Sequence, residues 1–158
     1  PLVAGCQTFQ YIHSLLRRRL FDLDAAKTAL EGGASVTGVI PTFLLEREAP
    51  AGNLTELEHC GSFAERKARM AELSDGFFVL PGGIGTLEEA FEVLTNLSIE
   101  RTRKPIGFVS TGGYYAPLFR MLETAQQEGF LGEGALSRVR VHEDPETLLK
   151  ELLELLGR

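Results

Sequence analysis

The stretch from Phe77 to Thr95 carries the residues best suited to chemistry. It reads FFVLPGGIGTLEEAFEVLT: an apolar run, a turn with one proline and three glycines, and then an acidic, amphipathic segment. Glycines let the main chain approach a phosphate closely, and a following helix presents N–H groups and a partial positive charge. The turn therefore predicts an anion site, to which the Thr86 hydroxyl can add a donor, with the carboxylate of Glu89 one turn inside the helix.

A structural interpretation of the same turn is also open. Thr86-Leu87-Glu88-Glu89 matches the capping box T-x-x-E, in which the threonine caps the helix and Glu89 reaches back to the Thr86 N–H. The glycine spacing matches neither the GxGxxG of dinucleotide-binding loops nor the GxxxxGK[ST] of Walker A loops. The local pattern alone does not choose between a capped helix and a ligand site.

A charged segment upstream bears on this choice. A helix is expected from about Ala64 to Leu73, with Ser62 as its candidate N-cap, and its first turns are rich in charge: Glu65, Arg66, Lys67 and Arg69. A solvated face is the ordinary explanation of such a run. The helix directly precedes the strand that ends in the glycine turn, so Arg66 or Lys67 can also reach that edge and hold an anion, and arginine is better suited to bidentate contact.

The elements that must position these residues alternate between strand and helix. Strands are expected at 34–40, 77–80, 105–110 and 139–142, and helices at 9–31, 64–73, 86–100, 115–128 and 145–156. Residues 2–4 suggest a strand end, and 46–57 a loop because the segment holds proline, glycine and asparagine. This alternation predicts an α/β fold, a parallel sheet with helices on both faces, whose ligands bind at the carboxyl ends of the strands.

Length and composition indicate one domain over residues 1–158. Apolar residues make up 44% of the chain, charged residues 24%, and the net charge of −6 argues against duplex nucleic acid as a partner. No apolar run approaches the roughly 20 residues of a membrane span. The two cysteines, Cys6 and Cys60, suggest free thiols in a reducing cytoplasm, and the spacing of the three histidines predicts no metal site.

The stretch ERKARM…LSDGFFVLPGGIGTLEEAFEVLT resembles the Lonely Guy family of cytokinin-activating phosphoribohydrolases, many of which were once labelled "possible lysine decarboxylase". The signature of that family, P-G-G-x-G-T-x-x-E after an R-K pair on a helix, is matched by residues 81–89 and by Arg66-Lys67. Further matches are GGASVTGVIP (32–41), NLTEL (53–57), KP (104–105) and GGYYAPL (112–118). The resemblance covers roughly residues 25–135.

The resemblance implies a Rossmann-like α/β fold of three layers and a homodimer or higher homo-oligomer. It also implies hydrolysis of the N-glycosidic bond of adenosine 5′-monophosphates, often N6-substituted, to the free base and ribose 5-phosphate. The catalytic pair that it implies is Arg66 and Glu89. The residues that it implies for binding of the 5′-phosphate are Gly82, Gly83, Gly85 and Thr86, and Lys67 and Pro81 are two further candidates. No metal or cofactor is implied.

Elementary chemistry agrees with these implied roles. Glycosidic cleavage builds positive charge on the ribose, so the Glu89 carboxylate would stabilise the transition state more than the ground state. Arg66 would orient the ribose phosphate and offset the repulsion between phosphate and Glu89. The four lysines stand in no Schiff-base context, so a pyridoxal-phosphate lysine decarboxylase is not expected.

The resemblance is weakest at the beginning of the chain. Family members have a first strand and helix, and then a Y-G-G-G-type loop that is followed by G-L-M-G. In this sequence the first strand and helix are absent, and LVAGC (2–6) takes the place of the loop. The residues that follow, 7–24, include no glycine. Three explanations stay open. An upstream segment is missing from this chain, as Pro1 in place of Met suggests; a loop has been left out and closed up by the numbering; or the sequence has truly diverged. Ala64 replaces a histidine of the family and Asn96 a tryptophan.

Two other classes of function also stay open. The first is a non-catalytic protein that binds a nucleotide or a phosphorylated cofactor, as molybdenum-cofactor carriers do. The second is an assembly or scaffold protein without a small-molecule ligand.

Overall fold

The computed structural model describes residues 9–12, 27–44 and 54–157 of the chain. The chain divides into two compact units, of which the first is Pro1–Gln7 with Leu15–Ser74 and the second is Thr8–Ser14 with Asp75–Arg158. A single domain over 1–158 stays a prediction.

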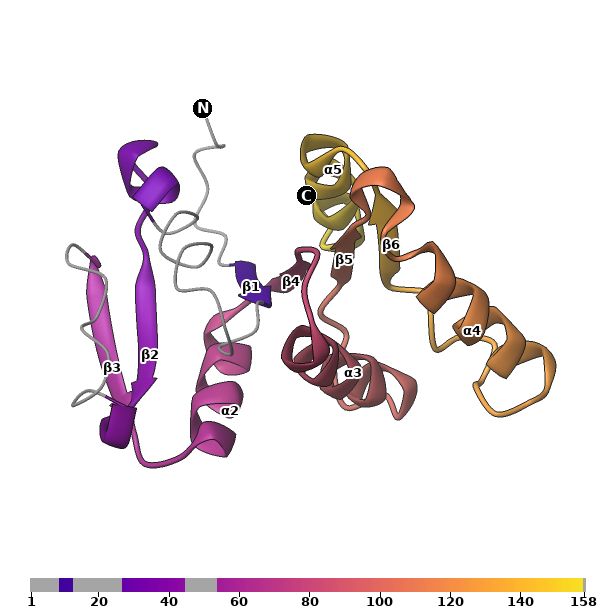
Figure 1. Ribbon diagram of the computed structural model, residues 1–158, viewed down its shortest axis with the longest axis horizontal. Coiled ribbons are helices and arrows are strands. Elements are labelled where there is room, and N and C mark those ends of the chain that lie inside the picture. Colours follow the sequence, from indigo (N-terminus) through magenta and orange to yellow (C-terminus); the bar gives the residue numbers. More distant parts are fainter. Residues whose placement is uncertain (1–8, 13–26, 45–53, 158) are drawn as a thin grey trace. The chain divides into compact units, whose positions relative to one another are not determined.

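The first unit contains a small parallel sheet covered by one helix. Strand β2 (Thr37–Pro41) pairs with β3 (Glu56–Cys60), in register from Thr37 opposite Glu56 to Pro41 opposite Cys60, and a 3-10 turn, η1 (Thr42–Leu44), follows β2. Helix α2 (Phe63–Leu73) packs against both strands. Figure 1 shows α2 running alongside the two strands.

The ends of the helices in this unit follow the sequence signals. The Ser62 Oγ accepts a hydrogen bond of 3.2 Å from the Glu65 N–H, and the Glu65 carboxylate accepts one of 2.7 Å from the Gly61 N–H. These two bonds satisfy orphan donors at the start of α2, as in a capping box. The predicted Ser62 cap is therefore confirmed. A helical segment over 27–31 ends at Gly32-Gly33 as predicted, and Gly33 has the positive φ of 80° that C-cap glycines adopt.

Two short strands were not predicted. Phe9–Ile12 forms β1 rather than the start of a helix, and Glu56–Cys60 forms β3 at the end of the expected loop. Both strands are short and get their hydrogen bonds from parallel partners distant in sequence, which local periodicity cannot report. The helical prediction for 13–26, the strand end at 2–4, the LVAGC loop and Cys6 lie outside the described residues.

The second unit contains a four-stranded, all-parallel sheet in the order β1-β4-β5-β6. Its further strands are β4 (Gly76–Val79), β5 (Ile106–Val109) and β6 (Val139–His142). Every residue of β4 and β5 is buried. Continuous burial of this kind is typical of strands that are covered on both faces, as the apolar runs in the sequence predicted.

Helices cover both faces of this sheet. A Cβ on Gly107 would lie 2.9 Å from the Cδ1 atoms of Leu148 and Leu152, so α5 (Pro145–Leu155) packs directly on that face of β5. The next residue, Phe108, points the other way, and its ring meets Phe119 of α4 (Ala116–Gln127) edge-on at 5.1 Å. Figure 1 shows α5 above the strands and α3 (Ile84–Ser98) with α4 below them.

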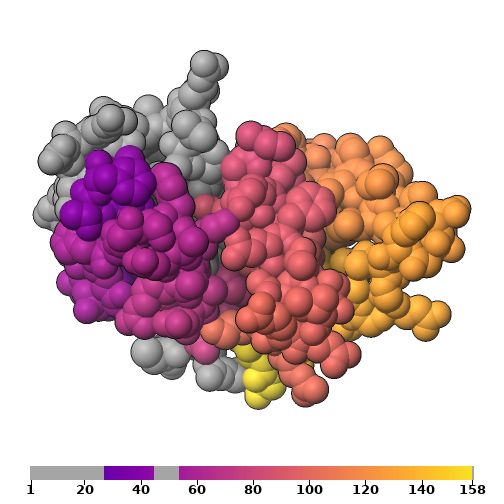
Figure 2. Space-filling view, turned by 90° about the horizontal axis from the view of Figure 1, so that it is seen from below, coloured from indigo at the N-terminus to yellow at the C-terminus, as the bar shows by residue number. Residues whose placement is uncertain are grey.

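The second unit is therefore a three-layer, Rossmann-like α/β arrangement, which confirms the predicted fold class. Seen from below, in Figure 2, the residues of α3 and α4 form the face that this unit presents to the viewer. Apart from β1, which was predicted as helix, the strands and helices of the unit agree with the predicted ones to within about two residues at each end. The carboxyl ends of β4 and β5 lie side by side at one edge of the sheet, where the glycine turn begins.

Candidate functional site

The glycine turn lies at the carboxyl end of β4 and leads directly into α3. Gly83 is the N-cap residue of α3, with an extended backbone (φ −90°, ψ −156°), and the first bond within the helix runs from the Leu87 N–H to the Gly83 carbonyl at 3.1 Å. The N–H groups of Ile84 and Gly85 therefore belong to the first turn, where a helix supplies no acceptor of its own. Such a turn is suited to receive an anion.

The capping-box interpretation of Thr86 is wrong. Helix α3 begins at Ile84, two residues earlier than predicted, so Thr86 lies inside the first turn and Glu89 lies six residues beyond the cap. The Thr86 side chain is fully buried and occupies the space beside Gly82, where an added Cβ would fall 2.8 Å from the threonine Cβ and closer still to its Oγ1. Gly82 is thus required by the packing of Thr86. A phosphate contact of the Thr86 hydroxyl stays a prediction.

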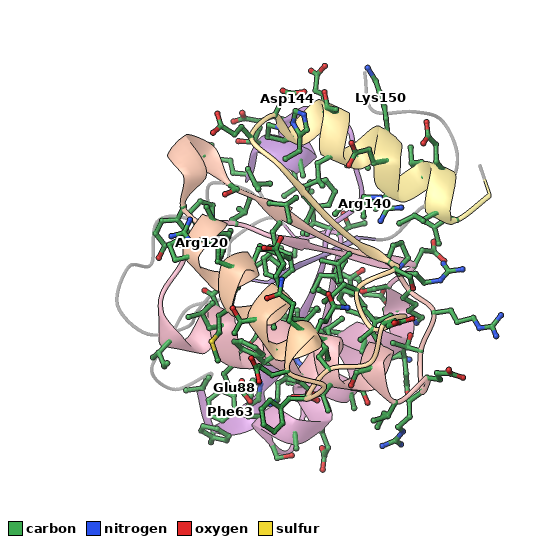
Figure 3. The ribbon with its side chains drawn as sticks, turned by 90° about the vertical axis from the view of Figure 1, so that its right-hand side faces the viewer. Phe63, Glu88, Arg120, Arg140, Asp144 and Lys150 are labelled. Atoms are coloured by element: carbon green, nitrogen blue, oxygen red, sulfur yellow. The ribbon has the colours of Figure 1, made fainter. Side chains whose placement is uncertain are left out.

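Glu89 is half-buried and lies one helical turn after the glycines. It follows Gly85 by four residues and Thr86 by three, which places all three on the same side of α3. The residue is half-buried and its Oε2 atom is buried, whereas the neighbouring Glu88, labelled in Figure 3, is exposed. A carboxylate that is partly removed from water interacts more strongly with a nearby positive charge than a solvated one does.

Two tyrosines from the segment between β5 and α4 hold the turn in place. The Tyr114 hydroxyl donates to the Gly82 carbonyl at 2.7 Å, and the Tyr115 hydroxyl donates to the Leu80 carbonyl at 2.6 Å. Burial raises the pKa of Tyr115 to about 12, so this hydroxyl keeps its proton and remains a donor at neutral pH. The carbonyls on both sides of Pro81 are therefore tied to the segment that follows β5.

A double-glycine turn places these tyrosines. Gly112 and Gly113 have φ values of 60° and 74° within η2 (Thr111–Gly113), a left-handed backbone that other residues rarely adopt. The buried Ser110 Oγ then accepts a hydrogen bond of 2.9 Å from the Tyr115 N–H. In the sequence, the stretch GGYYAPL (112–118) supported the family resemblance but did not predict this role of the tyrosines. The available signal was a tyrosine pair at the carboxyl end of the strand beside the glycine turn.

Arg66 and Lys67 lie on α2, in the first unit. The Arg66 Nε donates to the Val39 carbonyl of β2 at 3.0 Å, so the guanidinium is anchored to the edge of the small sheet. Both residues are half-buried. The glycines, Thr86 and Glu89 are together at the β4–α3 junction of the second unit, and the pairing of Arg66 with Glu89 stays a prediction.

The remaining charge of this helix segment has a structural role. Arg69 makes a bidentate contact with Glu58 on β3, at 2.6 and 2.9 Å, and a third contact with Glu72 at 3.2 Å. The hydrogen bonds from Arg69 lower the pKa of the Glu58 carboxyl. For Arg69, therefore, the ordinary interpretation of a solvated, paired helix face is correct.

The described residues contain neither a cluster of metal-ligating side chains nor a helix suited to cross a membrane. Among 9–12, 27–44 and 54–157, no group of three or more histidine, cysteine, aspartate or glutamate residues is arranged to hold a metal ion. In the same ranges no helix has both the length and the apolar character that crossing a membrane requires.

Comparison with known proteins adds a family and several relatives. The family model described as "Possible lysine decarboxylase" matches residues 24–152. The cytokinin riboside 5′-monophosphate phosphoribohydrolase of Rhodococcoides fascians is 45% identical over 122 residues, which are 77% of this chain and 62% of the relative. Proteins with the same name from Oryza sativa subsp. japonica and Arabidopsis thaliana are 41% identical over 66% of this chain and 35% identical over 84% of it. The chain spans 43% to 62% of the length of these three curated relatives.

Proposed function

The chain belongs to the family described as possible lysine decarboxylase, the Lonely Guy family, and we propose that it is a nucleoside 5′-monophosphate phosphoribohydrolase. It would hydrolyse the N-glycosidic bond of an adenosine 5′-monophosphate, with or without an N6 substituent, to the free base and ribose 5-phosphate. The observation that carries the proposal is the Glu89 carboxylate, whose Oε2 atom is buried, one turn inside the helix that begins at the glycine turn.

The glycine turn supports binding of the 5′-phosphate. A Cβ on Gly83 would meet no atom within 4 Å beyond its own chain neighbours, so the surface beside the start of α3 is open at this residue. The amino end of α3 adds a partial positive charge that favours a dianion. Pro81 and Gly82 define the path of the chain into this site, and the two tyrosine hydroxyls bond the Gly82 and Leu80 carbonyls. The phosphate would therefore bind to a rigid main-chain surface.

Glu89 supports the chemical step. One helical turn rises about 5.4 Å, which is the scale of a ribose ring between its phosphate and its anomeric carbon. A phosphate bound at the amino end of α3 would thus bring the anomeric carbon near the Glu89 carboxylate. As the glycosidic bond breaks, the carboxylate would stabilise the positive charge on the ribose and orient the attacking water.

Arg66 and Lys67 would complete the site from α2. Arg66 already gives its Nε hydrogen to Val39, so part of its side-chain entropy is lost before a ligand binds. The guanidinium has further N–H donors suited to a phosphate or ribose oxygen. We also propose that the chain acts as one domain in a homodimer or higher homo-oligomer, in the cytoplasm.

The curated relatives are named for hydrolysis of a nucleotide, not for decarboxylation. A pyridoxal-phosphate lysine needs a desolvated environment that lowers its pKa. None of the four lysines is fully buried: Lys27 and Lys150 are exposed and Lys67 and Lys104 are half-buried. The function in the family description is therefore not the one that we propose.

Release of base from AMP and from an N6-prenylated analogue, followed by chromatography, tests the proposal. We expect wild-type protein to release adenine and Glu89→Gln to lose at least a hundredfold in rate, because the neutral amide cannot offset positive charge on the ribose. Glu88→Gln is the matched control, since Glu88 is the exposed neighbour on the same helix. A wild-type protein that binds AMP without releasing base would refute hydrolysis and favour the carrier alternative.

A further inference from the structure

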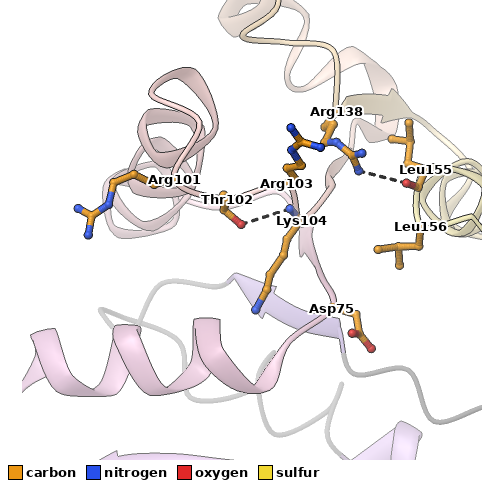
Figure 4. A pocket seen from close by; sticks show the side chains of 8 residues that line it. All are labelled: Asp75, Arg101, Thr102, Arg103, Lys104, Arg138, Leu155 and Leu156. Atoms are coloured by element: carbon orange, nitrogen blue, oxygen red, sulfur yellow. Dashed lines mark hydrogen bonds between the residues drawn. The ribbon is translucent and has the colours of Figure 1, made fainter.

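A second concave site lies at the opposite edge of the same sheet, where β4, β5 and β6 begin. It is an open pocket of about 490 Å³. Four basic side chains line it, Arg101, Arg103, Lys104 and Arg138, together with the Thr102 hydroxyl and a single carboxylate, Asp75. Figure 4 shows these side chains around the strand ends. We refer to this site as the amino-edge pocket.

The sheet itself brings these charges together. Asp75 precedes β4, Lys104 precedes β5 and Arg138 precedes β6. The Phe77 N–H donates to the Pro105 carbonyl at 2.9 Å, and the Ile106 N–H donates to the Arg138 carbonyl at 3.1 Å. Neighbouring strands lie about 4.8 Å apart, so residues that are far apart in sequence enter the sheet next to one another.

Hydrogen bonds hold the frame of the pocket. The Arg138 Nη1 donates to the Leu155 carbonyl at 3.1 Å, which fixes this guanidinium at the carboxyl end of α5. The Lys104 N–H donates to the Thr102 Oγ1 at 3.2 Å, which shapes the loop before β5. Figure 4 shows both bonds, and shows Arg103 and Arg138 extending to the same side of the loop. Two guanidinium groups are thus directed to one region by separate segments.

The charge of the pocket is not balanced by its own residues. Four cationic side chains and one carboxylate line the pocket, although the net charge of the chain is −6. Within the described part of the chain, Arg101, Arg103 and Arg138 form no salt bridge, in contrast to Arg69, which pairs with two glutamates. Like charges gathered in a hollow raise the local positive potential and concentrate anions there.

We propose that the amino-edge pocket binds a small polyphosphate anion. Arginine side chains match phosphate oxygens in bidentate geometry, and several cations favour a ligand with more than one negative charge. The volume lies within the range of about 300–1,000 Å³ that is common for small-molecule sites. The glycine turn follows the carboxyl end of β4 whereas this pocket lies at the amino ends, so the two sites are separate and this inference does not depend on the proposed function.

Titration of the full chain with inorganic phosphate, pyrophosphate and triphosphate, followed by calorimetry at constant ionic strength, tests this proposal. In the Gly83→Ala background, which should weaken phosphate binding at the glycine turn, we expect one saturable site whose affinity rises with the charge of the probe. Arg103→Gln and Arg138→Gln should each weaken triphosphate binding at least tenfold. Glutamine at position 138 is too short to keep the bond to the Leu155 carbonyl, so Arg103→Gln, at a side chain that makes no such bond, is the deciding variant.

Two controls separate this pocket from other sources of binding. Arg120→Gln removes an exposed cation of α4 that does not line the pocket, and should leave the affinity within twofold of wild type. Gly83→Ala alters the glycine turn alone and should leave triphosphate binding at the pocket unchanged. The proposal is overturned if no probe saturates, or if Arg103→Gln binds triphosphate as tightly as Arg120→Gln does.

Discussion

Gly82 and Gly83 are adjacent in sequence and have opposite surroundings, which makes them a matched pair for substitution by alanine. A Cβ on Gly82 would lie 2.8 Å from the Thr86 Cβ and 3.1 Å from its Cγ2. A Cβ on Gly83 would meet nothing within 4 Å. Both have negative φ values, so backbone strain does not separate the two variants. The same chemical change therefore tests packing at one position and ligand access at the other.

The expected cost of Gly82→Ala follows from the burial of Thr86. This side chain is fully buried and cannot move into solvent, so the added methyl must displace the turn or the helix. Overpacking of this kind costs about 1–3 kcal/mol. For a chain of this size each kcal/mol lowers the melting temperature by about 2–4 °C. We expect Gly82→Ala to melt roughly 2–12 °C below wild type.

Gly83→Ala should affect binding rather than stability. Alanine is a poorer N-cap than glycine but also restricts the unfolded chain, and the two effects offset one another to within about 0.5 kcal/mol. The new methyl group would lie in open space at the N-cap of α3, next to the proposed phosphate site. We therefore expect AMP binding to weaken at least tenfold while the melting temperature stays near that of wild type.

Thermal unfolding and AMP titration of both variants test the packing role of Gly82 and the ligand-binding role of Gly83. The double variant Gly82→Ala with Thr86→Ala adds a control, because removing the Thr86 side chain beyond Cβ relieves the closest contact with the new methyl. The packing argument fails if Gly83→Ala lowers the melting temperature as much as Gly82→Ala does. The phosphate role of the turn fails if Gly83→Ala binds AMP with wild-type affinity.

Two further predictions concern hydrogen bonds of the second unit. Tyr115→Phe leaves the Leu80 carbonyl without its donor and should lower the free energy of unfolding by about 1–3 kcal/mol in urea titration; an unchanged midpoint would contradict the role of this hydroxyl. Asp144 caps α5 by accepting from the Thr147 N–H and hydroxyl, and these bonds lower the pKa of its carboxyl from the ordinary 3.8. Its stabilising effect is therefore complete above that value and is lost as pH falls through the lower folded pKa. Asp144→Asn, compared by thermal unfolding between pH 5 and 2, should lose less stability on acidification than wild type, and parallel curves would refute this.

Local signals predicted most of the second unit. The apolar runs at 77–80 and 105–110 identified buried strands, and the leucine pattern at 145–156 identified the helix that packs on Gly107. Ser62 was recognised as a cap because its hydroxyl acts only three residues away. The strands β1 and β3 were missed because their partners, β4 and β2, are distant in sequence and their own composition is not distinctive.

The prediction of a capping box at Thr86 was wrong for a related reason. The motif T-x-x-E predicts the start of a helix from side-chain types alone. In the structure the main chain becomes helical two residues earlier, at Ile84. Packing against Gly82 then uses the threonine as a buried residue of the first turn. Tertiary packing therefore overrode the local T-x-x-E pattern.

The anion-binding character of the glycine turn could be inferred from the residues alone, because glycine freedom and the amino end of a helix are local properties. The hydrogen bonds that hold the turn in place could not be inferred from the sequence. The Tyr114 and Tyr115 hydroxyls meet carbonyls 32 and 35 residues earlier in the chain. They reach those carbonyls because β5 pairs in parallel with β4, so that both carboxyl ends open at the same edge of the sheet. That strand pairing depends on hydrogen bonds between distant segments, and it converts a flexible glycine sequence into a fixed surface.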